Sequence, residues 1–147
     1  MNALLSGFPI LETLNLYFNA EEYDIIRVPS TLKWLKIVLG NGDIGASLEM
    51  NAPGLEYLNI SEITFSNVGS LENVVEASLD VFPSPGDSAY AFTLLKLLET
   101  LSGVKHLVLS RSTTKWLLGG PADLRFLEFP HLLHLELILP WFNSNSL

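Results

Sequence analysis

The sequence predicts an α/β fold, a curved parallel sheet with helices and loops on its outer side, and three observations lead to this. A turn at Pro53-Gly54 is followed by the pattern Leu-x-x-Leu-x-Ile at residues 55–60. The apolar residues at the end of this pattern alternate, which is typical of a strand with one buried face. The pattern also recurs along the chain, and its copies begin at Leu11, Leu32, Leu55, Val74, Val104 and Leu132.

The spacing of the copies indicates the kind of repeat. Successive copies begin 21, 23, 19, 30 and 28 residues apart. A Leu-x-x-Leu-x-Leu pattern at such steps is the signature of leucine-rich repeats, in which every unit adds one strand to a solenoid. We therefore expect a single leucine-rich-repeat domain, 1–147, of about six irregular units. Their strands are expected within residues 11–17, 32–39, 55–61 and 71–82, from 104 onward, and from 132 to Pro140.

The segments between these strands differ in character. Residues 21–27 are rich in acidic side chains and are expected to form a polar crossover, whereas residues 46–51 alternate like another strand. Residues 89–101 carry apolar side chains at three- and four-residue steps, which predicts a helix. This helix accounts for the 30-residue step. A further short element is expected at residues 124–127.

A conserved device of the repeat is expected in the first unit alone. Leucine-rich repeats often place an Asn just after the strand, where its side chain satisfies backbone groups at the bend. Asn19 stands at this place, and the other units must satisfy those groups differently. The equivalent positions are Gly40, Ile63, Phe82, Ser112 and Pro140.

Composition narrows the classes of partner. Hydrophobic residues make up 48 % and mean hydropathy is +0.34, so further repeats or another domain are expected to cover part of the surface. Terminal repeats usually carry polar caps, yet Leu4, Phe8 and Leu139 lie near the chain ends, and we expect a fragment of a longer protein. The net charge is −8 and no Lys/Arg cluster appears, which argues against nucleic acid as a partner.

The uncharged stretches are too short to cross a bilayer. The longest are the terminal ones, residues 1–11 and 137–147, against the roughly 20 residues that a membrane-spanning helix needs. No membrane partner is therefore expected. The first residues lack the basic region and long apolar core of a signal peptide, which favours an intracellular location, cytoplasm or nucleus.

Two motifs raise the question of a cofactor or a metal. Residues 40–45 match G-x-G-x-x-G, but a dinucleotide site needs a helix directly afterwards, and only about six strand-like residues follow. His106 and His134 occupy equivalent places in successive units, and with Glu136 they could form a metal site. Exposed polar residues on a binding surface are the simpler interpretation. We expect no cofactor, no metal and no catalytic residues, since no nucleophile elbow, P-loop or carboxylate pair is present.

What remains is the face of the sheet that is turned away from the core. The residues between the buried ones form two columns, one through Trp34, Tyr57, His106 and His134 and the other through Lys36. Trp34 and Tyr57 should lie side by side, and large aromatic side chains dominate binding energy at interfaces. The expected partner-binding residues are Tyr17, Trp34, Lys36, Tyr57, His106 and His134.

Three segments resemble the leucine-rich-repeat region of plant F-box/FBD/LRR-type proteins. Residues 4–16 look like the leucine-rich opening of that family, with Phe8 where a Cys is usual. Residues 52–60 are similar to its Ala-Pro-x-Leu strand start, and residues 94–107 are similar to its long outer helix and following strand. No F-box helices precede Leu4 and no FBD segment follows Leu137, so a fragment, a truncated relative or an excised repeat domain is expected.

The resemblance implies a function. In this family the repeats would recognise a protein substrate for an SCF-type ubiquitin ligase, here on the concave sheet. A Skp1-like adaptor would be a partner only if a longer chain contains an F-box. The alternatives are a small-ligand, hormone-like receptor domain, which a deep pocket near Trp34 and Tyr57 would favour, and a truncated relative with no partner of its own.

Overall fold

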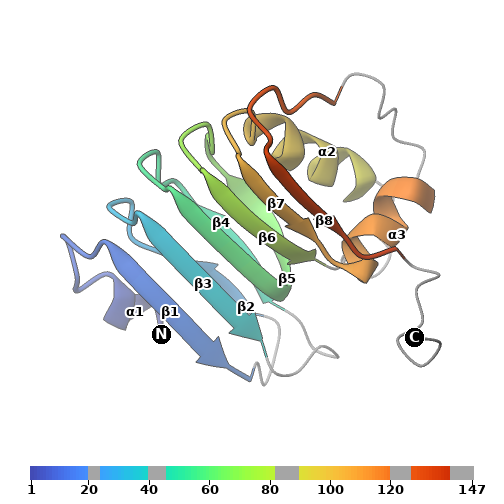
Figure 1. Ribbon diagram of the computed structural model, residues 1–147. Coiled ribbons are helices and arrows are strands. Elements are labelled where there is room, and N and C mark those ends of the chain that lie inside the picture. The colour runs from blue at the N-terminus through green and yellow to red at the C-terminus, as the bar shows by residue number, and fades with distance from the viewer. Residues whose placement is uncertain (20–23, 40–45, 82–89, 120–126, 140–147) are drawn as a thin grey trace.

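The protein folds around a parallel sheet of six strands that follow one another in chain order (Figure 1). The computed structural model describes residues 1–19, 24–39, 46–81, 90–119 and 127–139. All pairings in this main sheet are parallel, which confirms the predicted α/β class and parallel sheet. Its strands are β1 (Thr13–Phe18), β3 (Trp34–Leu39), β5 (Tyr57–Val68), β6 (Glu76–Val81), β7 (His106–Leu109) and β8 (His134–Leu137).

The repeated sequence pattern has a repeated backbone structure. The amide of Leu55 donates to the carbonyl of Ala52 at 3.0 Å, and this closes a turn just before the strand. The next two amides, of Glu56 and Tyr57, both donate to the carbonyl of Lys33 in the preceding unit, at 2.8 and 3.1 Å. The same turn bond precedes five of the six strands, and the paired bonds recur at every step between units. Each copy of the pattern therefore starts one strand of the main sheet.

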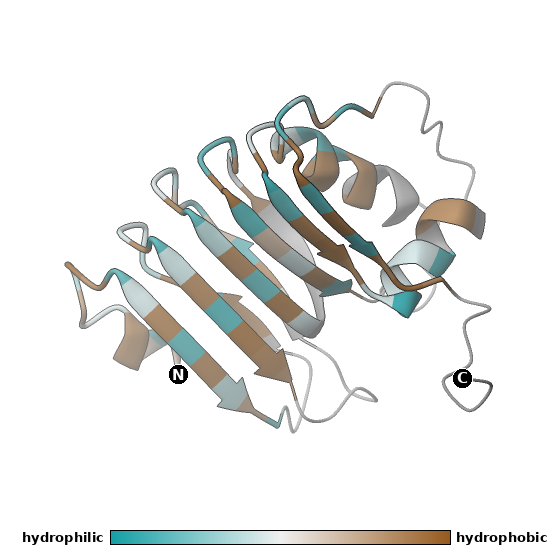
Figure 2. Ribbon diagram, in the orientation of Figure 1, coloured by the Kyte–Doolittle hydropathy of each residue, from teal (hydrophilic) through white to brown (hydrophobic). Residues whose placement is uncertain are grey.

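One face of the main sheet forms the core. Exposed or half-buried residues alternate with buried ones along β3, and Figure 2 shows the same alternation of hydropathy along the strands. Leu58 of β5 and Leu107 of β7 are both completely buried, as the pattern predicts. β8 differs, because Leu135 and Leu137 remain 51 % and 45 % exposed. The opposite face, which we call the open face, carries the residues between the buried ones.

A second layer covers the core face, and its composition changes along the chain. Behind the first three units it is made of β2 (Asp24–Arg27), β4 (Ala46–Met50) and the second half of β5, all parallel. Behind the last three it contains α2 (Tyr90–Thr100) and α3 (Arg111–Gly119). A short helix, α1 (Asn2–Leu5), lies beside β2. None of the described helices is long and apolar enough to cross a membrane.

Two elements of the second layer correct the sequence predictions. The expected polar crossover at residues 21–27 is wrong for its second half, because Asp24–Arg27 is strand β2 and Ile26 is completely buried. Helix α3 was not predicted. The element expected at residues 124–127 falls outside the described residues except for Leu127, which belongs to no helix or strand.

Other predictions for the crossovers are confirmed. Helix α2 covers Tyr90–Thr100, against an expected 89–101, and β4 confirms the strand-like segment at 46–51. Gly103 follows α2 where the chain passes another backbone closely. A Cβ atom there would lie only 2.6 Å from the carbonyl oxygen of Glu72, so no side chain fits without a backbone shift.

Thr113 shows how a unit without the repeat Asn satisfies its backbone. This completely buried side chain lies on α3 and reaches the end of β6. Its hydroxyl accepts a hydrogen bond from the amide of Val81 and donates one to the carbonyl of Leu79, both at 3.0 Å. An unmade buried hydrogen bond is costly, so this hydroxyl does work that the first unit was expected to assign to Asn19.

Candidate functional site: the open face of the main sheet

The strand register places the predicted columns of the open face side by side. Trp34 is opposite Tyr57, which in turn is opposite Glu76, and the column continues through His106 to His134. The second column runs parallel to it through Asn15, Lys36, Asn59, Ser78, Val108 and Glu136. The juxtaposition of Trp34 and Tyr57 that the sequence predicts is therefore present.

The two rings stack directly on one another. Their centroids are 3.6 Å apart and their planes differ by 12°. This spacing follows from the parallel register, because neighbouring strands lie about 4.8 Å apart and equivalent side chains stand in rows. Trp34 is 40 % exposed and Tyr57 is half-buried. The pair thus presents a rigid apolar surface to solvent at a modest cost in side-chain freedom.

Two asparagines hold the polar ends of these rings. The indole N–H of Trp34 donates to Oδ1 of Asn15 at 3.1 Å, and Nδ2 of Asn59 donates to the hydroxyl of Tyr57 at 3.1 Å. Neither asparagine was among the expected binding residues. The signal that could have found them is their place in the second column, next to an aromatic residue of the first.

Tyr17 and Lys36 extend this surface along the strands. Nζ of Lys36 lies 5.6 Å from the centroid of the Tyr17 ring, within the range of a cation–π contact. Tyr17 is 62 % exposed. We call Tyr17, Trp34, Lys36 and Tyr57 the aromatic cluster; all four come from the first three units.

The two histidines form a separate group on the same face. The rings of His106 and His134 have centroids 6.0 Å apart and are tilted by 42°. Glu76 stands between Tyr57 and His106 in the register. The six expected binding residues therefore share one face but fall into an aromatic cluster and a histidine pair. Within the described ranges no group of three or more His, Cys, Asp or Glu residues could hold a metal ion.

The G-x-G-x-x-G segment lies outside the described residues, but its flanks are described. β3 ends at Leu39 and β4 begins at Ala46. The element after the motif is thus a strand, and it offers no helix N-terminus to a pyrophosphate.

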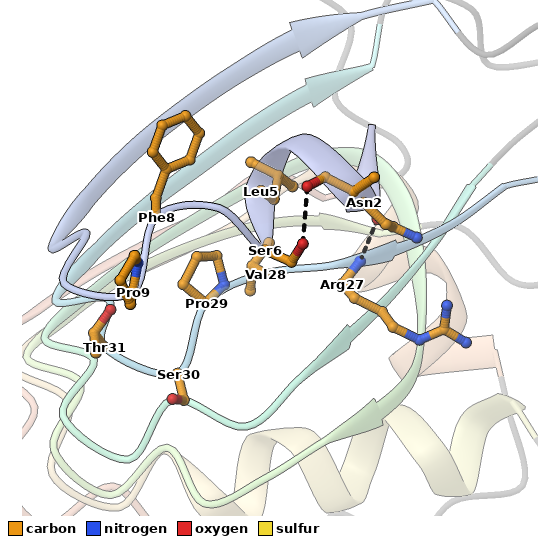
Figure 3. Close-up of a pocket in the computed structure, with 11 residues that line it drawn as sticks. Asn2, Leu5, Ser6, Phe8, Pro9, Arg27, Val28, Pro29, Ser30 and Thr31 are labelled. Atoms are coloured by element: carbon orange, nitrogen blue, oxygen red, sulfur yellow. Dashed lines mark hydrogen bonds between the residues drawn. The ribbon is translucent and has the colours of Figure 1, made fainter.

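Cavities among the described residues lie away from the aromatic cluster. One groove of about 630 Å³ lies between α1 and the segment after β2, where Leu5, Phe8, Val28 and Pro29 contribute to its lining (Figure 3). Asn2 fixes one wall, since its side chain accepts from the amide of Arg27 at 3.1 Å. A second cavity of about 460 Å³ is lined by Asp80 and residues of α3. Neither includes Trp34 or Tyr57, so neither supports a small-ligand site there.

Comparison with known proteins identifies similar sequences in Arabidopsis thaliana. An F-box/FBD/LRR-repeat protein is 28 % identical over 92 % of this chain and 34 % of its own length. Two FBD-associated F-box proteins are 32 % and 28 % identical, over 90 % and 95 % of this chain and 28 % and 36 % of their own lengths. The chain thus spans about a third of the curated relatives that it matches. No family model and no solved structure matches it.

Proposed function

Since the chain is homologous to a region of the plant F-box/FBD/LRR-repeat proteins, we propose that it is a non-catalytic leucine-rich-repeat solenoid that binds a protein partner. The binding surface is the open, concave face of the main sheet. Six copies of the pattern, six strands in chain order and a repeated backbone hydrogen-bond scheme support the solenoid.

The stacked Trp34–Tyr57 pair carries this proposal. Aromatic residues at interfaces account for much of the binding energy, about 2 kcal/mol or more each at hot spots. Here two rings are held by their neighbours in a fixed, exposed arrangement. Neither belongs to the core face, so the fold itself does not explain their presence.

The relatives suggest where such binding is used. We propose that the partner is a substrate protein of an SCF-type ubiquitin ligase in the cytoplasm or nucleus, with this chain as its recognition surface. A Skp1-like adaptor would bind an F-box elsewhere in a longer chain, and it is not expected to contact the main sheet.

Differential capture tests the proposal. Wild-type protein, the Trp34→Ala/Tyr57→Ala variant and a Leu118→Ala/Leu133→Ala control would be used as bait in plant extract, with quantitative mass spectrometry. The control removes apolar side chains that are 54 % and 79 % exposed but lie outside the aromatic cluster. We expect the aromatic variant to lose partners that the control keeps, by about 2–4 kcal/mol in affinity. Retention of every partner by the aromatic variant would refute the assignment of this surface.

A further inference from the structure

Charge is distributed unevenly across the open face. Lys36 lies in the aromatic cluster, within the first three units, whereas Glu76 and Glu136 lie on β6 and β8 in the last three. Both carboxylates are exposed. Neither forms an ion pair with any residue that the structure describes; the basic residues Arg27 and Lys33 pair elsewhere, with Glu49 and Glu12.

Glu76 stands directly beside the aromatic cluster. It is the register partner of Tyr57 on the side away from Trp34. Trp34 stacks on one face of the Tyr57 ring, so the other face of that ring is turned toward β6 and Glu76. An aromatic face next to an unpaired carboxylate is a setting that suits a guanidinium or ammonium group, which can contact the ring and pair with the carboxylate together.

From this arrangement we infer that the partner is a polypeptide segment with a basic side chain close to a large apolar one. The segment crosses the strands, with the apolar side chain on the aromatic cluster and an Arg or Lys between Tyr57 and Glu76. Glu136 extends the negative charge toward β8 for a second basic residue. Successive strands are about 4.8 Å apart and an extended chain advances about 3.3 Å per residue, so the two anchoring side chains are separated by one to four residues.

This inference rests on the proposed function, since it needs the open face to be the binding surface. Its charge component is separate and can fail alone. The net charge of −8 favours approach of a basic segment at long range, but it acts on the whole surface. Local pairing with Glu76 is what distinguishes this site from general attraction.

A displayed library of random dodecapeptides provides the probe. It would be selected in parallel on the wild-type chain and on three variants: Glu76→Gln, Trp34→Ala/Tyr57→Ala, and the control Glu99→Gln. Glu99 is an exposed carboxylate on α2, away from the open face, so its loss changes net charge equally. We expect wild type and Glu99→Gln to retain peptides with Arg or Lys one to four residues from an aromatic or aliphatic residue.

The Glu76→Gln selection should lose the basic preference. A peptide selected on the wild type should bind this variant about three- to tenfold more weakly, and Glu99→Gln about as well as the parent. Peptides that require the aromatic cluster but show no basic preference would overturn this inference and leave the proposed function intact. Equal weakening by Glu76→Gln and Glu99→Gln would overturn it too. If the wild type retains nothing beyond the aromatic variant, the inference is wrong, and differential capture decides the function separately.

Discussion

The first three units and the last three start their strands in the same way and return through different structures. Behind the first half the chain returns as strands, and behind the second half it includes helices. Unit length separates the two cases, since the first three steps are 19–23 residues and the last two are 28–30. One strand pattern is therefore compatible with two kinds of second layer.

Rise per residue explains the difference in length. A strand advances about 3.3 Å per residue and a helix 1.5 Å. The 5 residues of β4 and the 11 of α2 therefore both cover about 16 Å. The same holds for the 4 residues of β2 and the 9 of α3, at about 13 Å each. A helical return along the same distance needs more residues, which the longer units supply.

The open face changes at the same boundary. Aromatic side chains and Lys36 occupy the first three units, whereas carboxylates and histidines occupy the last three. The core face remains leucine-rich in both. The comparison indicates that the strand pattern supplies stability throughout and that recognition is concentrated where the aromatic residues are.

The largest effect should come from the core position that the units share. Leu58, Leu107 and Leu135 occupy the fourth position of the pattern, but the first two are completely buried and Leu135 is 51 % exposed. Replacing Leu58 or Leu107 with Ala should lower the free energy of unfolding by about 2–5 kcal/mol. Leu135→Ala should lower it by less than about 1 kcal/mol.

Urea denaturation of the three variants measures this. Equal costs for Leu58→Ala and Leu107→Ala would show that the core is as well packed under strands as under helices. A Leu135→Ala cost as large as theirs would contradict the exposed placement of β8.

A smaller loss is expected where α3 joins β6. Thr113→Val keeps the shape of the side chain but removes both hydrogen bonds to the β6 backbone. The amide of Val81 loses its partner, and we expect a cost of about 1–3 kcal/mol. Thr100→Val is the matched control, because its hydroxyl donates only to Leu97 within α2. Thermal melts that rank Thr100→Val above Thr113→Val would argue against this junction as a support for the second half.

The smallest effect should distinguish the two ring pairs of the open face. Trp34 and Tyr57 stack at 3.6 Å, whereas His106 and His134 are 6.0 Å apart and tilted. Double-mutant cycles to Ala should give a coupling energy of about 0.5–1.5 kcal/mol for the stacked pair. The histidine pair should give less than about 0.5 kcal/mol. Equal couplings would mean that the aromatic cluster is no more rigid than the histidine pair.

Sequence alone predicted what depends on local alternation. The strand positions, both columns of the open face and helix α2 follow from apolar spacing, and the register confirms the contact between Trp34 and Tyr57. Strand β2 was missed because its four residues are too few to show a period, and its pairing with β4 depends on residues far along the chain.

Helix α3 was missed for a different reason. Its first turns contain Ser112, Thr113 and Thr114, which have low intrinsic helix propensity. Thr113 and Thr114 also form hydrogen bonds to β6 and to the carbonyl of Ile138, so tertiary contacts support a weak helical sequence. The ring-holding asparagines were missed similarly, since their roles depend on side-chain contacts across strands.

Site-specific photo-crosslinking tests most directly whether partners bind the open face of the first three units. A photoreactive phenylalanine would replace Tyr17 in one protein and Ile25 in another; these residues are 62 % and 39 % exposed, on the main sheet and the second layer respectively. We predict that the partner retained by the wild type and lost by Trp34→Ala/Tyr57→Ala crosslinks from position 17 and not from position 25. Crosslinking from position 25 alone would contradict the account and place recognition on the second layer.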